Sequence, residues 1–348
     1  MKYILSCLGA CFVLVSCSQT QLPTQSTDAT SAIVLPKIYA AGSYMKTNQV
    51  ACYWINTTCY DLTDGTGQSS ANAIAAINGK IYIAGYRNGD GISGACLWTN
   101  DNQFSYLPNN TGSLSGANAR SLFIYNGNTY IAGDYYDKIS NVFVACYWVG
   151  SSLPVALIGD GTGIHDSHAT GIYVDNNDIY VSGYYYDGAT NYSCYWKNGG
   201  TPITLHSGST QSFIAVNSGT TYNVNSSGNY WIGDIENDLG SWIMPSAISI
   251  SSGHVYIAGS FYEGYSLGYT AGFMQDSSQY RMHMYSSVCN SIYIRNEIVY
   301  LAGQFAGKAS YWVGLPVLDN GTSPTWIGYQ NGTYLPEQGS TINSIFVE

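Results

Sequence analysis

A repeated pair of residues constrains this chain more than any other feature: an aliphatic residue and, eight positions later, a tyrosine that usually opens a Tyr-x-Ala-Gly segment. The intact pairs are Ile74/Tyr82, Leu122/Tyr130, Ile172/Tyr180, Ile214/Tyr222, Ile248/Tyr256 and Ile292/Tyr300. A seventh copy is split, because Ile345 lies near the C-terminus and Tyr39 near the N-terminus. A repeat divided in this way predicts a ring that the two ends of the chain close.

The composition favours strands over helices. Only 9% of the residues are charged, whereas glycine and tyrosine occur 39 and 33 times. No apolar stripe with a 3.6-residue period stands out. The 348 residues exceed what one hydrophobic core usually serves, but repeats that pack only against their neighbours escape that limit. We therefore expect an all-β repeat protein.

The copy at residues 168–205 shows what one repeat builds. β-branched and alternating residues predict strands, and Asn- and Gly-rich stretches predict turns. The predicted strands are 168–174, 179–183, 192–196 and 202–205, separated by a turn at 176–178, a loop at 184–191 and a hairpin turn at 198–200. Four antiparallel strands in about 45 residues match one propeller blade. The sequence therefore predicts a seven-bladed β-propeller of four-stranded antiparallel blades.

The C-terminal strand is expected to complete the first blade. Residues 344–347 match residues 121–124, but the chain ends where the other repeats turn into Tyr-x-Ala-Gly. That missing part is found at residues 36–39. Pairing of the two ends would leave no free sheet edge in the ring.

The repeated aromatic and glycine residues are interpreted as structural. The third strand of most repeats carries a segment like Ala51-Cys52-Tyr53-Trp54, whose rings we expect between blades. The glycine that ends Tyr-x-Ala-Gly is expected where a side chain would crowd the adjacent backbone. The copy between Tyr222 and Tyr256 is short and is expected to form the most irregular blade.

The cysteines of the repeats are expected to be reduced. Those at the repeated position before Tyr-Trp or Leu-Trp lie in different blades, too far apart for a disulfide, and are interpreted as small buried hydrophobes. They are Cys52, Cys96, Cys146 and Cys194. A local disulfide between Cys52 and Cys59 is left open as a hypothesis.

These features resemble the seven-bladed propeller repeats of secreted bacterial proteins, loosely Ala-x-Ala-x-Asp-x-x-Gly-Asn-x-Tyr-Val-x-Gly. Residues 169–175 and 179–183 carry the nearest match. The resemblance covers residues 33–348. It implies a fold and no particular activity, because propellers host binding, scaffolding and catalysis alike.

The N-terminus resembles a bacterial lipoprotein signal peptide. Residues 1–17 combine Lys2, an apolar stretch and Leu14-Val15-Ser16-Cys17, which is similar to a lipobox. The resemblance implies lipidation, for example palmitate, of Cys17 and anchoring in the bacterial cell envelope. Under the sorting rule of the lipoproteins that the N-terminus resembles, the absence of an aspartate next to Cys17 would favour the outer membrane. The alternative is an ordinary secretory signal. The Ser-, Thr- and Gln-rich residues 18–32 predict a flexible tether.

The net charge of the chain argues against some classes of binding partner. The formal net charge is −10 and basic residues do not cluster, so we expect neither nucleic acid nor anionic lipid headgroups as partners. No sequence motif indicates a cofactor, and we expect a monomer.

Aromatic and acidic residues follow several Tyr-x-Ala-Gly segments. In a propeller, the loops between strands two and three share a rim with the loops between blades. Aromatic faces with carboxylates would suit a glycan, and tyrosines also suit a protein ligand. Alternatively, the rings continue the packing between blades and the acids solvate turns. The candidate ligand-binding residues are Tyr135, Tyr136, Asp137, Tyr185, Tyr186, Asp187, Phe261, Tyr262 and Glu263.

A metal site is a second hypothesis for this rim. His165 and His168 lie close in sequence to Asp160, and these residue types bind transition metals. The alternative is an exposed loop. The Asp-Gly-Thr-Gly segments at 64–67 and 160–163 are interpreted as turns, because each offers too few oxygen ligands for calcium.

The leading functional prediction is a membrane-anchored binding module for a glycan or protein, without catalysis. No nucleophile elbow with partners and no carboxylate pair for glycoside cleavage stands out. Two alternatives remain open. One is an envelope-assembly scaffold. The other is a hydrolase or lyase that uses rim carboxylates or the segment 165–168.

Overall fold

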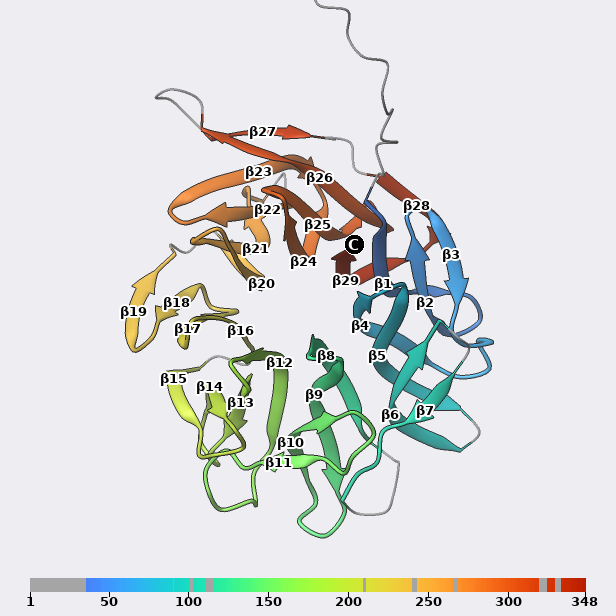
Figure 1. The fold of residues 1–348 in the computed structure, drawn as a ribbon, viewed down its shortest axis with the longest axis vertical. Helices are drawn as coiled ribbons and strands as arrows, with labels where there is room; N and C mark the ends of the chain where they lie inside the picture. Colours follow the sequence, from blue (N-terminus) through green and yellow to red (C-terminus); the bar gives the residue numbers. More distant parts are fainter. Residues whose placement is uncertain are drawn as a thin grey trace, which may run out of the picture. The chain divides into compact units, whose positions relative to one another are not determined.

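A computed structural model describes residues 36–89, 91–100, 103–110, 116–208, 211–239, 243–265, 268–318, 324–328 and 333–348. Pro36–Glu348 forms one compact unit. Its described strands build seven sheets around a central axis, as Figure 1 shows. Paired strands run antiparallel. The prediction of an all-β, seven-bladed propeller is confirmed.

Each blade starts with its innermost strand, and we number the blades from the closing one. Blade 1 contains β29 (Thr341–Val347), β1 (Ile38–Met45), β2 (Gln49–Ile55) and β3 (Thr58–Asp61). Blade 2 contains β4 (Ser69–Ile77), β5 (Lys80–Gly89), β6 (Ile92–Thr99) and β7 (Phe104–Tyr106). Blade 3 contains β8 (Asn118–Tyr125), β9 (Asn128–Asp137), β10 (Val142–Val149) and β11 (Val155–Leu157).

The second half of the ring follows the same order. Blade 4 contains β12 (Ser167–Asp175), β13 (Asp178–Tyr186), β14 (Asn191–Lys197) and β15 (Ile203–Ser207). Blade 5 contains β16 (Ser212–Asn217), β17 (Thr220–Asn225), β18 (Asn229–Ile232) and β19 (Ile235–Asp238). Blade 6 contains β20 (Ile243–Ser251), β21 (His254–Tyr262), β22 (Tyr269–Gln275) and β23 (Ser278–Tyr285). Blade 7 contains β24 (Ser287–Arg295), β25 (Ile298–Phe305), β26 (Lys308–Leu318) and β27 (Pro324–Gly328), and β28 (Thr333–Gln338) also pairs with β26.

The two ends of the unit close the ring. β29 pairs with β1, with Tyr39 opposite Phe346. Lys37 and Glu348 exchange both backbone hydrogen bonds, at 3.1 and 3.0 Å. The predicted closure by the C-terminal strand is therefore confirmed, and β1 has partners on both sides.

Turn residues and glycines fix the register of the inner hairpins. Asn78 and Gly79 have φ angles of 52° and 75°, as the tight hairpin between β4 and β5 requires. Farther along β5, a Cβ added to Gly85 would lie 2.0 Å from the carbonyl oxygen of Ser70. The glycine of Tyr-x-Ala-Gly is therefore needed for the close approach of two strands, as predicted.

The core lies between adjacent blades rather than inside any one of them. The cluster between blades 1 and 2, for example, joins Tyr39 and Ala51 to Ile83 and Trp98. The side chains of Trp54, Trp148, Trp196 and Trp312 are fully buried. The indole of Trp148 donates a hydrogen bond to the Pro108 carbonyl at 2.6 Å. These contacts confirm that the repeated tryptophans are packing residues.

No disulfide links the cysteines of the described residues. Cys52, Cys96, Cys146 and Cys194 are buried, as predicted. The hypothesis of a Cys52–Cys59 disulfide is wrong, because the β2–β3 register places Cys59 opposite Trp54 and Cys52 opposite Asp61.

The strands of blade 4 differ in one respect from the prediction, and those of blade 5 agree with it. β13 extends to Tyr186 because Tyr184, Tyr185 and Tyr186 pair with β14, so the predicted loop at 184–191 is shorter than expected. Blade 5 is the blade of short strands, as expected. Its second strand carries Asn223 and Asn225 where other blades have an aliphatic residue and glycine.

The predicted signal peptide at 1–17 and the tether at 18–32 lie outside the described residues. Within the part of the chain that the structure describes, no helix is long and apolar enough to span a membrane.

Candidate functional site

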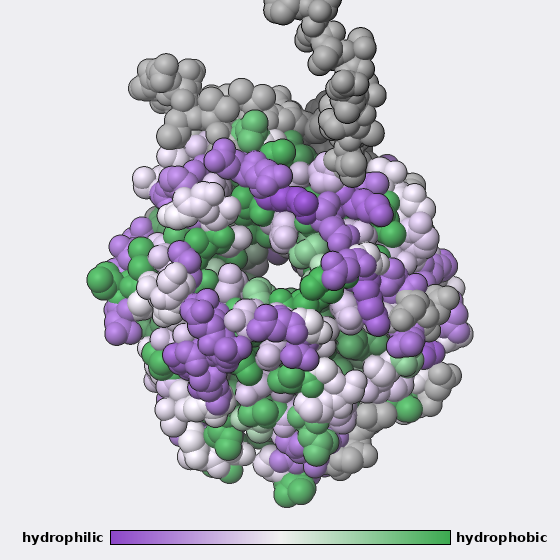
Figure 2. All heavy atoms as spheres, viewed as in Figure 1, coloured by the Kyte–Doolittle hydropathy of each residue, from purple (hydrophilic) through white to green (hydrophobic). Residues whose placement is uncertain are grey.

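A channel runs along the axis of the ring and holds a cavity of about 630 Å³. Figure 2 shows its opening at the centre of the ring, with hydrophobic side chains at the wall. The aliphatic residue of each repeat pair lines the wall, one from every blade: Ile74, Leu122, Ile172, Ile214, Ile248, Ile292 and Ile345. The feature that revealed the repeat in the sequence therefore forms an apolar lining.

Polar residues line the channel at irregular points of the inner strands. In six blades the register between the first two strands shifts by one residue. Each of these β-bulges leaves one extra residue on the inner strand. We call this set the collar: Asn72, Arg120, Thr170, Ser246, Asn290 and Asn343.

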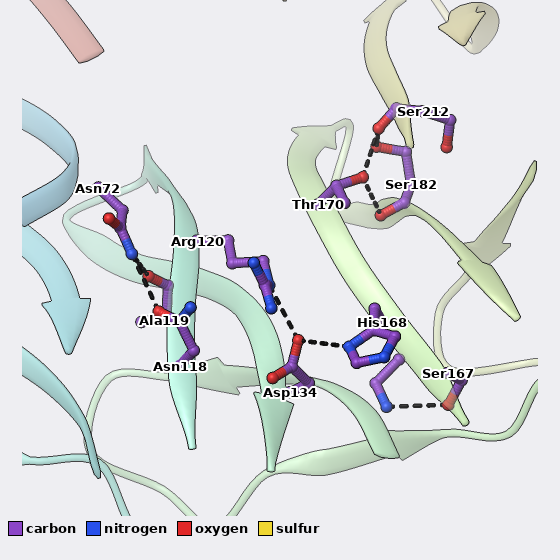
Figure 3. A network of polar contacts seen from close by, with 11 residues as sticks. Asn72, Asn118, Ala119, Arg120, Asp134, Ser167, His168, Thr170, Ser182 and Ser212 are labelled. Carbon is purple, nitrogen blue, oxygen red and sulfur yellow. Dashed lines mark hydrogen bonds and ion pairs between the residues drawn. The ribbon is translucent and has the colours of Figure 1, made fainter. Parts of the chain in front are cut away.

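Arg120 belongs to a polar network between blades 3 and 4 (Figure 3). Its Nε atom donates to Asp134 Oδ2 at 2.9 Å, and His168 Nδ1 lies 2.9 Å from the same oxygen. Asp134 follows the Tyr-x-Ala-Gly glycine on β9, whereas His168 opens β12. The Asp134 side chain is only 2% exposed, against 14% for His168 and 36% for Arg120.

The network fixes the orientation of the imidazole. A carboxylate only accepts hydrogen bonds, so His168 donates through Nδ1–H. Its Nε2 atom is then the nitrogen left for a ligand or a proton transfer. Asp134 gains a cationic partner and a second donor, as a buried carboxylate requires. This is the arrangement of a general acid–base histidine with an orienting carboxylate.

Four aromatic rings lead along the rim to this network, and we call them the aromatic row. Ring centres of Tyr136 and Phe143 lie 5.3 Å apart, those of Phe143 and His168 5.4 Å, and those of His168 and Tyr184 4.9 Å. All four side chains are half-buried, so each keeps part of its surface open. Burial raises the pKa of Tyr184, although the charge of Arg120 opposes this shift. The phenol therefore keeps its proton at neutral pH.

The predicted aromatic residues alternate between two environments because they lie in strands, not in loops. Tyr135 and Phe261 are 5% and 0% exposed, and Tyr185 packs against the core between blades 3 and 4. Tyr136, Tyr186 and Tyr262 are half-buried. The structure therefore does not gather the six rings into one flat platform, and only Tyr136 belongs to the aromatic row.

The predicted rim acids serve turns and ion pairs. Asp137 accepts from the backbone N–H of Ile139, and Asp187 accepts from those of Thr190 and Ala189, which lowers the pKa of both carboxyls. Glu263 pairs with Arg281 at 3.1 Å. None of these three carboxylates contacts the Asp134 network in the described residues.

The proposed metal ligands are separated into two pairs. His165 Nδ1 lies 2.5 Å from Asp160 Oδ2, whereas His168 faces Asp134. No group of three or more His, Cys, Asp or Glu side chains within the described ranges is placed to hold a metal ion. The loop and strand ends do meet at one rim, as expected, because the ring centre of His165 lies 5.8 Å from that of Tyr186.

Sequence reasoning found His168 and Tyr136 but missed the other members of the site. Arg120, Asp134, Phe143 and Tyr184 stand at repeated positions and look ordinary one at a time. A signal was nevertheless present, since Arg120 is the one charged residue in its repeat series and Asp134 follows a repeat glycine.

No protein-family model and no curated protein matches this chain. Among solved structures it is similar to a sialidase from Trypanosoma rangeli, with a TM-score of 0.47 and 9% identity over 89% of this chain and 57% of that one. It is similar to a thermostable family-43 glycoside hydrolase, with a TM-score of 0.37 and 12% identity over 62% of this chain and 93% of that one. An α-L-arabinofuranosidase from Clostridium thermocellum gives 0.36 and 10% over 78% and 96%. Likeness at this level concerns the fold alone.

The leading prediction of a binding module without catalysis is corrected here. Glycoside hydrolases and a sialidase stand among the similar structures, and these are named for catalysis, not for binding alone.

Proposed function

We propose that the chain is a hydrolase that acts on a glycan at the rim between blades 3 and 4. The observation that carries this proposal is the imidazole of His168 held through Nδ1 by the buried Asp134. A histidine whose orientation is fixed by a buried carboxylate is suited to move protons in a reaction.

His168, Tyr184 and Asp134 have different roles in the proposed hydrolysis. His168 Nε2 accepts a proton from a water molecule whose oxygen bonds to the carbon under attack. The bond from that carbon to the leaving oxygen breaks, and this oxygen receives the proton of the Tyr184 hydroxyl. Solvent then returns the proton from His168 to Tyr184, so the net reaction consumes one water. Asp134 orients the imidazole and stabilises its charged form, as carboxylates do in other histidine-dependent hydrolases.

The aromatic row supports a sugar as the substrate. The apolar faces of pyranose rings stack on aromatic side chains. Phe143 lies next to His168, and Tyr136 lies next to Phe143. A ring bound on these residues would place its linkage near the imidazole, which provides the proximity on which catalysis depends.

The experiment is a turnover screen of the full chain on a panel of polysaccharides, with reducing ends as the readout. We expect His168→Ala to lower kcat at least about 100-fold, as loss of a general acid–base group does. The matched control is His254→Ala, because His254 Nδ1 also lies 2.7 Å from a carboxylate, that of Asp276, but this pair is exposed on blade 6. Equal turnover by wild type and His168→Ala would refute the assignment.

We also propose that Cys17 carries lipid and anchors the protein in the cell envelope, with the outer membrane favoured. The segment Leu14-Val15-Ser16-Cys17 supports this proposal. Metabolic labelling with an alkyne fatty acid tests it. Label should be present in the natural chain and absent after Cys17→Ser. Equal labelling of the two would contradict it.

A further inference from the structure

The collar residues have a shared structural role. In five blades the collar side chain donates a hydrogen bond to a backbone carbonyl of the next blade. The bonds are Asn72 to Ala119 at 2.8 Å, Ser246 to Cys289 at 2.6 Å, Asn290 to Ile342 at 2.8 Å, Asn343 to Ala71 at 3.0 Å, and Thr170 to Ser212. These uncharged side chains are therefore engaged in holding neighbouring blades together.

Arg120 occupies the same position and departs from that role. Its Nε atom bonds Asp134 of its own blade instead of a carbonyl of blade 4. Among the described residues, its two terminal nitrogens have no hydrogen-bond partner. The side chain is 36% exposed, whereas Asp134 beneath it is 2% exposed. The two terminal nitrogens are therefore not engaged by the buried carboxylate.

The charge of Arg120 is also unusual for its surroundings. It is the one charged residue among the described residues that line the channel cavity. The chain as a whole has a formal net charge of −10, so long-range attraction would not draw an anion to this place. Recognition would have to come from contact, and a guanidinium fork suits the two oxygens of a carboxylate or sulfate.

We infer that the two terminal nitrogens of Arg120 bind an anionic group of the glycan, so that the protein selects acidic over neutral polysaccharides. This inference rests on the proposed function and adds its substrate class. The aromatic row would bind the sugar rings, and Arg120 would bind their anionic groups. Carboxylate and sulfate share this chemistry, and matched probes distinguish them.

Direct binding to the full chain tests the inference. The probes are oligogalacturonate and its methyl ester for the carboxylate, and dextran sulfate and dextran for the sulfate. We expect the wild type to prefer at least one anionic member over its neutral partner. Arg120→Gln should weaken binding of that member about 10- to 100-fold and leave the neutral partner unchanged. Arg120→Lys, which keeps the charge but loses the fork, should fall between the two.

Controls separate recognition from folding. Arg281→Gln removes a guanidinium that pairs with Glu263 on blade 6 and should leave the preference intact. Because Arg120→Gln leaves Asp134 without its cation, the double variant Arg120→Gln/Asp134→Asn provides a neutral replacement of the pair. The preference should be lost in both. Equal or no binding of the anionic probes by the wild type, or an unchanged preference in both variants, would overturn the inference.

The inference and the proposed function can fail separately. Loss of turnover in His168→Ala with no effect of Arg120→Gln on the anionic preference would keep the hydrolase and reject the anion site. Binding of an anionic probe that depends on Arg120, without turnover of any substrate, would keep the anion site and reject the hydrolase.

Discussion

His168 Nδ1 lies 2.9 Å from Asp134 Oδ2, and this contact joins the first strand of blade 4 to the second strand of blade 3. The pair is therefore assembled only when the two blades pack. Asp134 has one further hydrogen-bonding partner among the described side chains, Arg120. The position of one carboxylate thus sets both the orientation of the imidazole and that of the guanidinium.

The first prediction concerns the tautomer of His168. In the natural protein, the Asp134 carboxylate should hold the proton on Nδ1 of the neutral ring. Asp134→Ala removes the acceptor and should shift the ring toward the Nε2–H tautomer that free imidazoles prefer. Nitrogen chemical shifts of His168, measured by NMR in a histidine-labelled sample, report the change without any substrate. An identical tautomer in the two proteins would show that Asp134 does not orient the ring.

The second prediction tests the repeated glycine. Gly85→Ala would place a Cβ 2.0 Å from the Ser70 carbonyl oxygen, so the two inner strands of blade 2 would have to separate. We expect a loss of at least about 2 kcal/mol in the free energy of unfolding. Gly79→Ala is the control, because it meets no atom within 4 Å and suffers only from its positive φ. Its loss should be about 1 kcal/mol. Equal losses in urea denaturation would contradict the steric explanation.

The third prediction concerns a buried amide in blade 5. Asn223 is fully buried, and neither its Oδ1 nor its Nδ2 atom has a hydrogen-bond partner in the described structure. Blade 4 has Val181 at the corresponding position. Asn223→Val should therefore raise the free energy of unfolding by about 1–3 kcal/mol, because an unpaired buried polar group is expensive.

The matched control for this prediction is Asn343→Val. Asn343 is a collar residue whose amide donates to the Ala71 carbonyl, so its replacement should lower stability by about 1 kcal/mol. Thermal and urea unfolding of the two variants should move in opposite directions. A loss of stability in Asn223→Val would indicate an ordered water bound to the amide instead.

The fold could be predicted from the sequence because its determinants are local and repeated. Asn78-Gly79 fixes a hairpin, the Gly85 position requires a bare backbone, and the split between Ile345 and Tyr39 reveals the closure. The end of β13 was harder to place, because Tyr184 to Tyr186 become strand through pairing with β14, which composition does not disclose.

The candidate site could not be predicted to the same extent because it depends on packing between blades. Asp134 and His168 are 34 positions apart, and neither residue reveals alone that it will be buried beside the other. Pattern reasoning favoured His165, Asp160 and His168 as one group because they are close in sequence. The strand that begins at Ser167 turns His168 toward blade 3, whereas His165 stays in the preceding loop.

The fourth prediction concerns stability in acid. Burial alone would raise the pKa of Asp160, but hydrogen bonds from Thr162 and His165 outweigh it and lower this pKa to about 2. A carboxyl with a depressed pKa stabilises the fold above its unfolded value, near 3.9, and this contribution is lost as the pH falls toward 2. Asp160→Asn should therefore reduce the free energy of unfolding by about 2 kcal/mol at most at pH 6, and the difference from the natural protein should shrink between pH 4 and pH 2.

Asp64→Asn is the control for this prediction. Asp64 accepts hydrogen bonds from Thr66 in the corresponding turn but has no histidine partner, so its replacement should have a smaller effect on stability. Urea titrations at a series of pH values measure both variants, and a difference for Asp160→Asn that stays constant down to pH 2 would contradict the assignment.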